Sequence, residues 1–149
     1  MSISVRPAGY EFKLAIEAGE EKVEFTLKQL TYREKSYITG LASTTVKGEM
    51  SIDSTLTCFY NIKYALKDAT GIVDENGDPY KLKFDDDKTV SDECIDELLA
   101  SDISDQLQYS ALHLSENRFP DTVIHPLSRV PIEGVSVIPL EKLAVVRKK

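Results

Sequence analysis

Apolar and polar residues alternate strictly in two neighbouring stretches near the start of the chain. Residues 10–16 and 23–28 each carry a large apolar side chain at every second position, with mostly Glu, Lys or Thr between, and residues 18–21 separate them. A period of two is typical of a strand with one buried face. We therefore predict an antiparallel hairpin, and since an isolated hairpin is marginal in water, we expect helices to cover its apolar face.

The pattern changes to a helical one after residue 30. Thr31 and Glu34 have the T-x-x-E spacing of a capping box, in which the two side chains satisfy free backbone amides at a helix start. A first helix is predicted from this point to Ala42. A loop that contains Gly48 is expected to follow it.

Apolar residues then recur at steps of three and four from Ser51 to Ala69, which predicts one long helix that ends at Gly71. Tyr60 and Tyr64 lie one turn apart on a second flank of this helix. That flank is either the edge of the core or a surface that contacts a partner.

Turn residues and a new alternation follow the long helix. Residues 72–84 combine a turn-forming stretch with alternating apolar positions, which predicts a second, shorter hairpin. Ser91 is a suitable N-cap for the next helix, and a helical continuation is expected from Ser101 to Asn117.

Beyond Phe119 the chain is rich in proline, which breaks helices, so an extended segment is predicted. It is too apolar to remain free in water and is expected to dock on its own domain or on a neighbouring subunit. The sequence thus predicts one α+β domain over residues 1–119, with an N-terminal β-hairpin or small antiparallel sheet packed on a mostly helical part, and a C-terminal tail over residues 120–149. The candidate protein-binding residues are Tyr60, Tyr64, Val135, Val137, Ile138, Leu140, Leu143 and Val146.

Composition and charge narrow the class of function. A chain of 149 residues with 42% hydrophobic residues is suited to one core. The formal net charge of −7 repels nucleic-acid phosphates and anionic membranes. Because there is neither an apolar leader nor a run of about 18 apolar residues, we expect a cytoplasmic protein without a nucleic-acid or membrane partner.

Candidate chemistry is sparse. Asp74 and Asn76 suggest a calcium loop, but Gly77 falls at the fourth position of the pattern rather than the sixth. The cysteines and histidines lack metal-ligand spacing, and the single glycines form no phosphate-binding motif. We expect no metal, no cofactor and no enzymatic activity. An enzyme would need a cleft in which Cys58 or a histidine such as His113 meets a carboxylate.

The order of elements resembles the tail assembly chaperones of long-tailed, siphophage-type bacteriophages or prophages. The resemblance runs from about Val23 to Leu114. It rests on residues 23–31 leading into a helix, on residues 67–71 at the end of the long helix, and on residues 72–79 followed by an acidic helix.

The resemblance implies a protein that binds and solubilises the tape-measure protein, forms homo-oligomers and helps to recruit the major tail protein in the bacterial cytoplasm. It assigns no role to any single residue. The alternative is another phage structural or adaptor module that binds proteins and has no catalytic activity.

Overall fold

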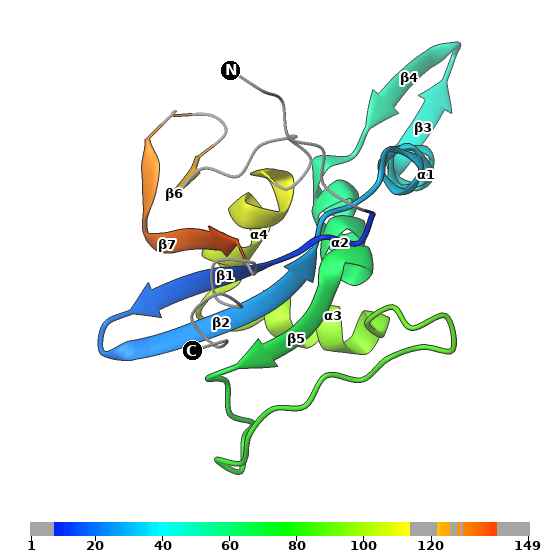
Figure 1. Cartoon of the computed structure of the whole chain (residues 1–149). Coiled ribbons are helices and arrows are strands. Elements are labelled where there is room, and N and C mark those ends of the chain that lie inside the picture. Colours follow the sequence, from blue (N-terminus) through cyan, green and yellow to red (C-terminus); the bar gives the residue numbers. More distant parts are fainter. Residues whose placement is uncertain (1–7, 114–121, 126–127, 129, 140–149) are drawn as a thin grey trace.

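The computed structural model describes residues 8–113, 122–125, 128 and 130–139 of the chain, and it has an α+β fold (Figure 1). One antiparallel sheet has the strand order β5-β2-β1-β7-β6, and β3 and β4 form a separate two-stranded sheet. The strands are β1 (Glu11–Ala18), β2 (Glu21–Lys28), β3 (Ser43–Val46), β4 (Glu49–Ile52), β5 (Leu66–Thr70), β6 (Thr122–Ile124) and β7 (Pro131–Pro139). The helices are α1 (Tyr32–Ala42), α2 (Ser54–Ala65), α3 (Asp92–Leu99) and α4 (Ser104–His113).

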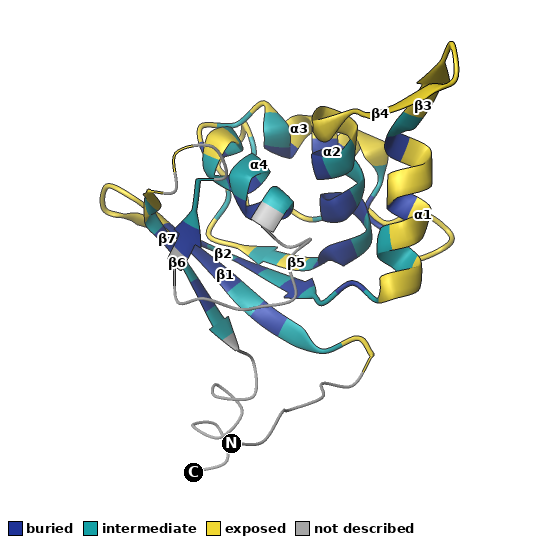
Figure 2. Cartoon of the chain, turned by 90° about the horizontal axis from the view of Figure 1, so that it is seen from above, coloured by how far each residue is buried: buried dark blue, intermediate teal, exposed yellow. Residues whose placement is uncertain are grey.

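The core lies between one face of the large sheet and the helices, which Figure 2 shows together on one side of it. Leu14 at the centre of β1 lies opposite Phe25 of β2 and Val137 of β7, and all three side chains are buried. The helices contribute further buried side chains, which include Ile38, Ile62, Ile95 and Leu107. The predicted arrangement of a small antiparallel sheet packed on helices is confirmed.

The signals that depend on neighbouring residues are also confirmed. β1 and β2 pair in register from Glu11↔Lys28 to Ala18↔Glu21, as the alternation predicts. At the start of α1 the Glu34 amide donates to Thr31 Oγ1 at 3.2 Å and the Thr31 amide donates to Glu34 Oε1 at 3.0 Å. The capping box therefore forms in full.

The long helix predicted from Ser51 to Gly71 is wrong at both ends. Helix α2 begins at Ser54, after strand β4, and ends at Ala65. Leu66–Thr70 is strand β5, which pairs antiparallel with β2. Leu66 is fully buried in the strand, so an apolar side chain at this position is compatible with a strand as well as with the predicted helix. Gly71 does end the element: at a φ of +87° it lies so close to the Lys22 carbonyl oxygen that a Cβ would overlap it.

The second predicted hairpin, over residues 72–84, is present only as a turn. The Asp74 carboxylate accepts hydrogen bonds from the amides of Asn76 at 2.9 Å and Asp78 at 3.0 Å, and one bridge joins Val73 to Pro79. The residues beyond the turn belong to no strand, and an isolated bridge joins Phe84 to Val90.

The described part of the segment from residue 120 onward docks on the rest of the same chain. Strand β7 pairs antiparallel with β1, and Val135 and Val137 are buried in the common core. These two side chains are therefore used inside the chain and are not exposed for a partner. Ile138 is half-buried. The remaining candidates of this segment lie outside the described residues: Leu140, Leu143 and Val146.

Candidate protein-interaction site

A two-stranded hairpin projects from the body of the molecule between α1 and α2 (Figure 1). We call this hairpin, Ser43–Ile52, the arm. Its turn residues Lys47 and Gly48 have φ values of 54° and 81°, the left-handed pair that a two-residue type I′ turn requires. Three apolar side chains of the arm are more than half exposed: Val46, Met50 and Ile52.

The arm corrects the loop predicted after the first helix. A signal for it exists in the sequence, because Thr44, Thr45 and Val46 are β-branched and precede a two-residue turn that contains glycine. The signal is weak because the strands have only four residues each and no face of them is buried.

The two helices at the base of the arm expose a second apolar surface, which we call the helix seam. It consists of Tyr37 and Leu41 on α1 and Leu56 on α2, which are exposed, and of Tyr60 and Tyr64 on α2, which are half-buried. The rings of Tyr37 and Tyr64 meet edge to face with their centroids 6.0 Å apart. Tyr60 and Tyr64 also pack partly against the core. They occupy the edge of the core, and their exposed parts continue into the seam.

Charge is distributed very unevenly along the chain. Residues 72–105, which we call the acidic segment, contain twelve acidic and three basic residues, a net charge of −9. Residues 31–56, which include the arm and most of the seam, contain three of each and are neutral. In Figure 1 the arm and the acidic segment lie on opposite sides of α1. The apolar surface is therefore the part of this acidic chain that repels an acidic partner least.

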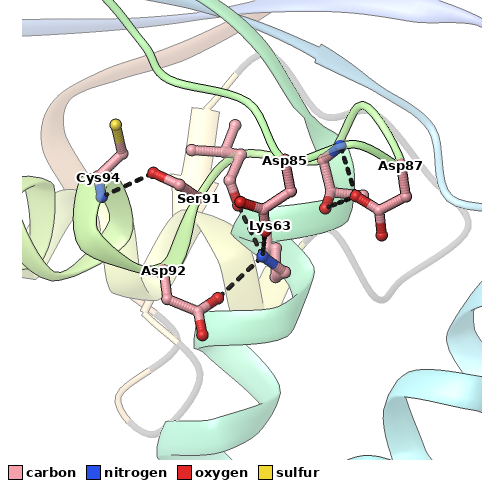
Figure 3. A network of polar contacts seen from close by, with 8 residues as sticks. Lys63, Asp85, Asp87, Ser91, Asp92 and Cys94 are labelled. Atoms are coloured by element: carbon pink, nitrogen blue, oxygen red, sulfur yellow. Dashed lines mark hydrogen bonds and ion pairs between the residues drawn. The ribbon is translucent and has the colours of Figure 1, made fainter.

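One buried ammonium group holds the acidic segment against α2 (Figure 3). Lys63 Nζ lies 2.9 Å from Asp85 Oδ2 and 2.8 Å from Asp92 Oδ1, and it donates to the Val90 carbonyl oxygen at 2.8 Å. Beside it, the Ser91 hydroxyl accepts from the Cys94 amide and caps α3. The network explains why a segment of such high negative charge packs closely on the helical layer.

Two potential nucleophiles, the Lys63 amine and the Cys58 thiol, have raised pKa values and stay protonated at neutral pH. Burial alone would lower the pKa of Lys63, but Asp92 and Asp85 outweigh it and leave the pKa raised, so the amine stays charged. Burial raises the pKa of the Cys58 thiol to about 11, and its Sγ donates to the Gln108 carbonyl oxygen at 3.4 Å. Neither group is in its nucleophilic form, the neutral amine or the thiolate, at neutral pH.

A groove of about 300 Å³ between α4 and β6–β7 contains both His125 and Asp105. The His125 ring lies 4.1 Å from the ring of Tyr109, its Nδ1 accepts from the Ser128 amide at 3.3 Å, and its backbone amide donates to Val130. These are the contacts of a residue that closes a turn. Cys58 is buried elsewhere, against α4, and does not line this groove, so the groove does not bring a thiol to the histidine.

Within the described ranges, no three His, Cys, Asp or Glu side chains gather in an arrangement that would hold a metal ion. None of the helices in the part of the chain that the structure describes has the length and apolar character needed to cross a bilayer.

Comparisons with protein-family models, with curated proteins and with solved structures found no match to this chain. The central feature of its described surface is the exposed apolar area formed by the helix seam and the arm.

Proposed function

We propose that this chain is a tail assembly chaperone of a siphophage-type bacteriophage or prophage. In this role it binds and solubilises the tape-measure protein in the bacterial cytoplasm and helps to recruit the major tail protein. The observation that carries the proposal is the apolar helix seam, most of which lies in a neutral stretch of a strongly acidic chain.

The seam suits a partner helix with one apolar face. Tyr37 and Leu41 are one turn apart on α1, and Leu56, Tyr60 and Tyr64 follow one another at one-turn spacing on α2. Two rows of side chains on adjacent helices offer the ridges between which an amphipathic helix packs. A tape-measure protein is long and exposes such helices before the tail tube surrounds it.

The acidic segment supplies the second property that a chaperone needs. The segment meets the seam at Tyr64, where Asp87 is close enough to act on the phenol. Most of its acidic side chains are exposed, so the greater part of its charge of −9 stays in solvent when the seam is covered. Several bound copies would give the complex a large negative charge and keep it soluble.

The proposal is tested by co-expressing the tagged chain with the tape-measure protein of the same phage or prophage, which we expect to be a very long helical protein encoded directly downstream. We expect the wild-type chain to retain that protein and to keep it in the soluble fraction. Leu41→Glu and Leu56→Glu place a charge in the seam at positions that are each 38% exposed, so both variants should fold and lose the partner. Val73→Glu is the matched control, because Val73 is 62% exposed but lies in the acidic segment.

If the wild-type chain retains no tail protein, or if the seam variants retain as much as the control, the proposal is wrong. The other candidate is a structural or adaptor protein of the virion that binds proteins through the same apolar surface. The two differ in fate, because a chaperone is absent from finished particles and a structural component persists in them. Mass spectrometry of purified particles distinguishes these outcomes.

A further inference from the structure

We propose that the arm joins two copies of this chain through the outer edges of their β4 strands. The product would be a four-stranded antiparallel sheet in the order β3-β4-β4-β3, with a two-fold axis between the two β4 strands.

The pattern of the arm places the polar backbone groups of Met50 and Ile52 on the outer edge. In an antiparallel ladder, residues alternate between those bonded to the partner strand and those that point away from it. The amide of Asp53 donates to the carbonyl oxygen of Ala42 at 2.8 Å, so Ala42 and Asp53 form a hydrogen-bonded pair. By alternation, Thr44 and Ser51 form the next hydrogen-bonded pair within the arm. The amides and carbonyls of Met50 and Ile52 therefore point away from β3, towards the outer edge.

These outward groups are complementary to a second copy of themselves. If Met50 of one copy lies opposite Ile52 of the other, each pair exchanges two backbone hydrogen bonds, and the two-fold axis repeats the pair. Met50 and Ile52 are 66% and 54% exposed, and they would contact each other across the new strand pair. Ser51 then lies opposite Ser51 at the centre, as a pair that is not hydrogen-bonded.

The low stability expected of an isolated two-stranded sheet favours the pairing of two arms. A two-stranded hairpin by itself is marginal in water, and three or more strands are needed for independent stability. All residues from Thr44 to Ile52 are exposed in the single chain, so nothing within its described residues covers the arm. A second arm supplies the missing strands.

The charge distribution supports a second copy as the occupant. Two chains with a formal charge of −7 each repel one another over most approaches. The neutral stretch of residues 31–56 carries the arm, and the acidic segment lies on the other side of α1. Contact through the arms therefore keeps the two acidic segments far apart.

The inference rests on the proposed function for its biological meaning, since it names the surface for the self-association of the chaperone. Its experiment uses the purified chain alone, so it can fail while binding to the tape-measure protein succeeds, and the reverse also holds.

The first experiment is disulfide trapping with Ser51→Cys. In the proposed register the two Ser51 Cα atoms lie about 4.5 Å apart, within the range that a disulfide spans. Thr44→Cys is the matched control: Thr44 is exposed on the same face, with its Oγ1 3.1 Å from Ser51 Oγ, but it would lie three strand spacings, about 14 Å, from its counterpart. The native Cys58 and Cys94 are buried and do not interfere. Under mild oxidation we expect Ser51→Cys to form covalent dimers and Thr44→Cys to remain monomeric.

The second experiment measures association without a cross-link. Sedimentation equilibrium of the wild-type chain should give a mass that rises with concentration towards twice 16.7 kDa. Ile52→Lys should weaken dimerisation about a hundredfold, because a two-fold interface contains the substitution twice and each copy costs about tenfold. Val73→Lys, at an exposed apolar position outside the arm, should dimerise as the wild type does. A wild-type monomer at the highest soluble concentration, equal cross-linking of the two cysteine variants, or equal dimerisation of the two lysine variants would overturn the inference.

Discussion

The substitution Gly134→Ala tests whether β7 lies as close to β1 as the structure shows, because it adds one methyl group where the two strands meet. The φ of Gly134 is +78°, and a Cβ placed on it would lie closer than 3.0 Å to the carbonyl oxygen of Glu17 in β1. Gly134→Ala therefore introduces two costs, a left-handed backbone for a residue with a side chain and a clash with a backbone atom that has no freedom to turn away.

The two costs are separated by comparison with Gly77→Ala. Gly77 has a similar φ of +83°, but a Cβ there meets nothing within 4 Å. The left-handed conformation costs about 1–2 kcal/mol in both variants. Forcing two strands apart adds about 1–3 kcal/mol at Gly134 alone. We expect Gly134→Ala to lose about 2–5 kcal/mol of the free energy of unfolding and Gly77→Ala about 1–2 kcal/mol.

Urea unfolding followed by circular dichroism measures both values, and an unchanged slope against urea shows that the two variants unfold as the wild type does. Hydrogen exchange at β1 checks whether β7 has come away instead of being strained. Equal losses in the two variants, with normal protection of β1, would refute the close approach of β7 to β1.

Three further predictions concern separate parts of the chain. Gly40→Ala, in the interior of α1 with open space around its Cβ, should raise the free energy of unfolding by about 0.8–1 kcal/mol in the same urea assay. Burial opposes ionisation of Glu34, but Lys28 and the Thr31 amide outweigh it and hold its pKa below 4.5. The stabilisation by this carboxylate is thus present above pH 4.5 and is lost as the pH falls through the lowered pKa, so wild type and Glu34→Gln should differ at pH 7 and converge once the pH lies below that lowered pKa. Cys58, with its pKa raised to about 11, should react with a disulfide reagent at pH 8 only after unfolding, and fast labelling of the native chain would contradict its burial.

The features that the sequence predicts correctly are those that neighbouring residues determine. The hairpin of β1 and β2 follows from strict alternation around Gly19, and the start of α1 follows from Thr31 and Glu34 alone. For strand β5 the sequence predicts helix instead, because Leu66 and Ala69 continue the helical spacing of α2. The extended form of β5 comes from pairing with β2, more than 35 residues earlier, which local spacing does not record.

The candidate site was only partly predictable for the same reason. The flank of Tyr60 and Tyr64 is visible in the helical spacing, but Tyr37 joins it only through the packing of α1 on α2. The hydrophobicity of Val135 and Val137 makes them candidates for binding a partner when only the sequence is considered. The sequence does not show that β1 offers them a free edge within the same chain.

Because β1 lies at the centre of the sheet, one of its two edges has no partner strand for part of the time in which the chain is synthesised. The neighbouring strand β2 leaves the ribosome directly after β1, whereas Val135, which lies opposite Ile16, comes 119 residues later. At about 5–20 residues per second, roughly 6–24 s pass before β7 exists to cover that edge. During this interval a newly made chain carries an open strand edge beside Leu14 and Ile16, and neighbouring chains on the same message carry it too. Slower translation of the last third of the gene would lengthen the exposure, so the yield of soluble protein should depend on codon usage there more than on codon usage in the first third.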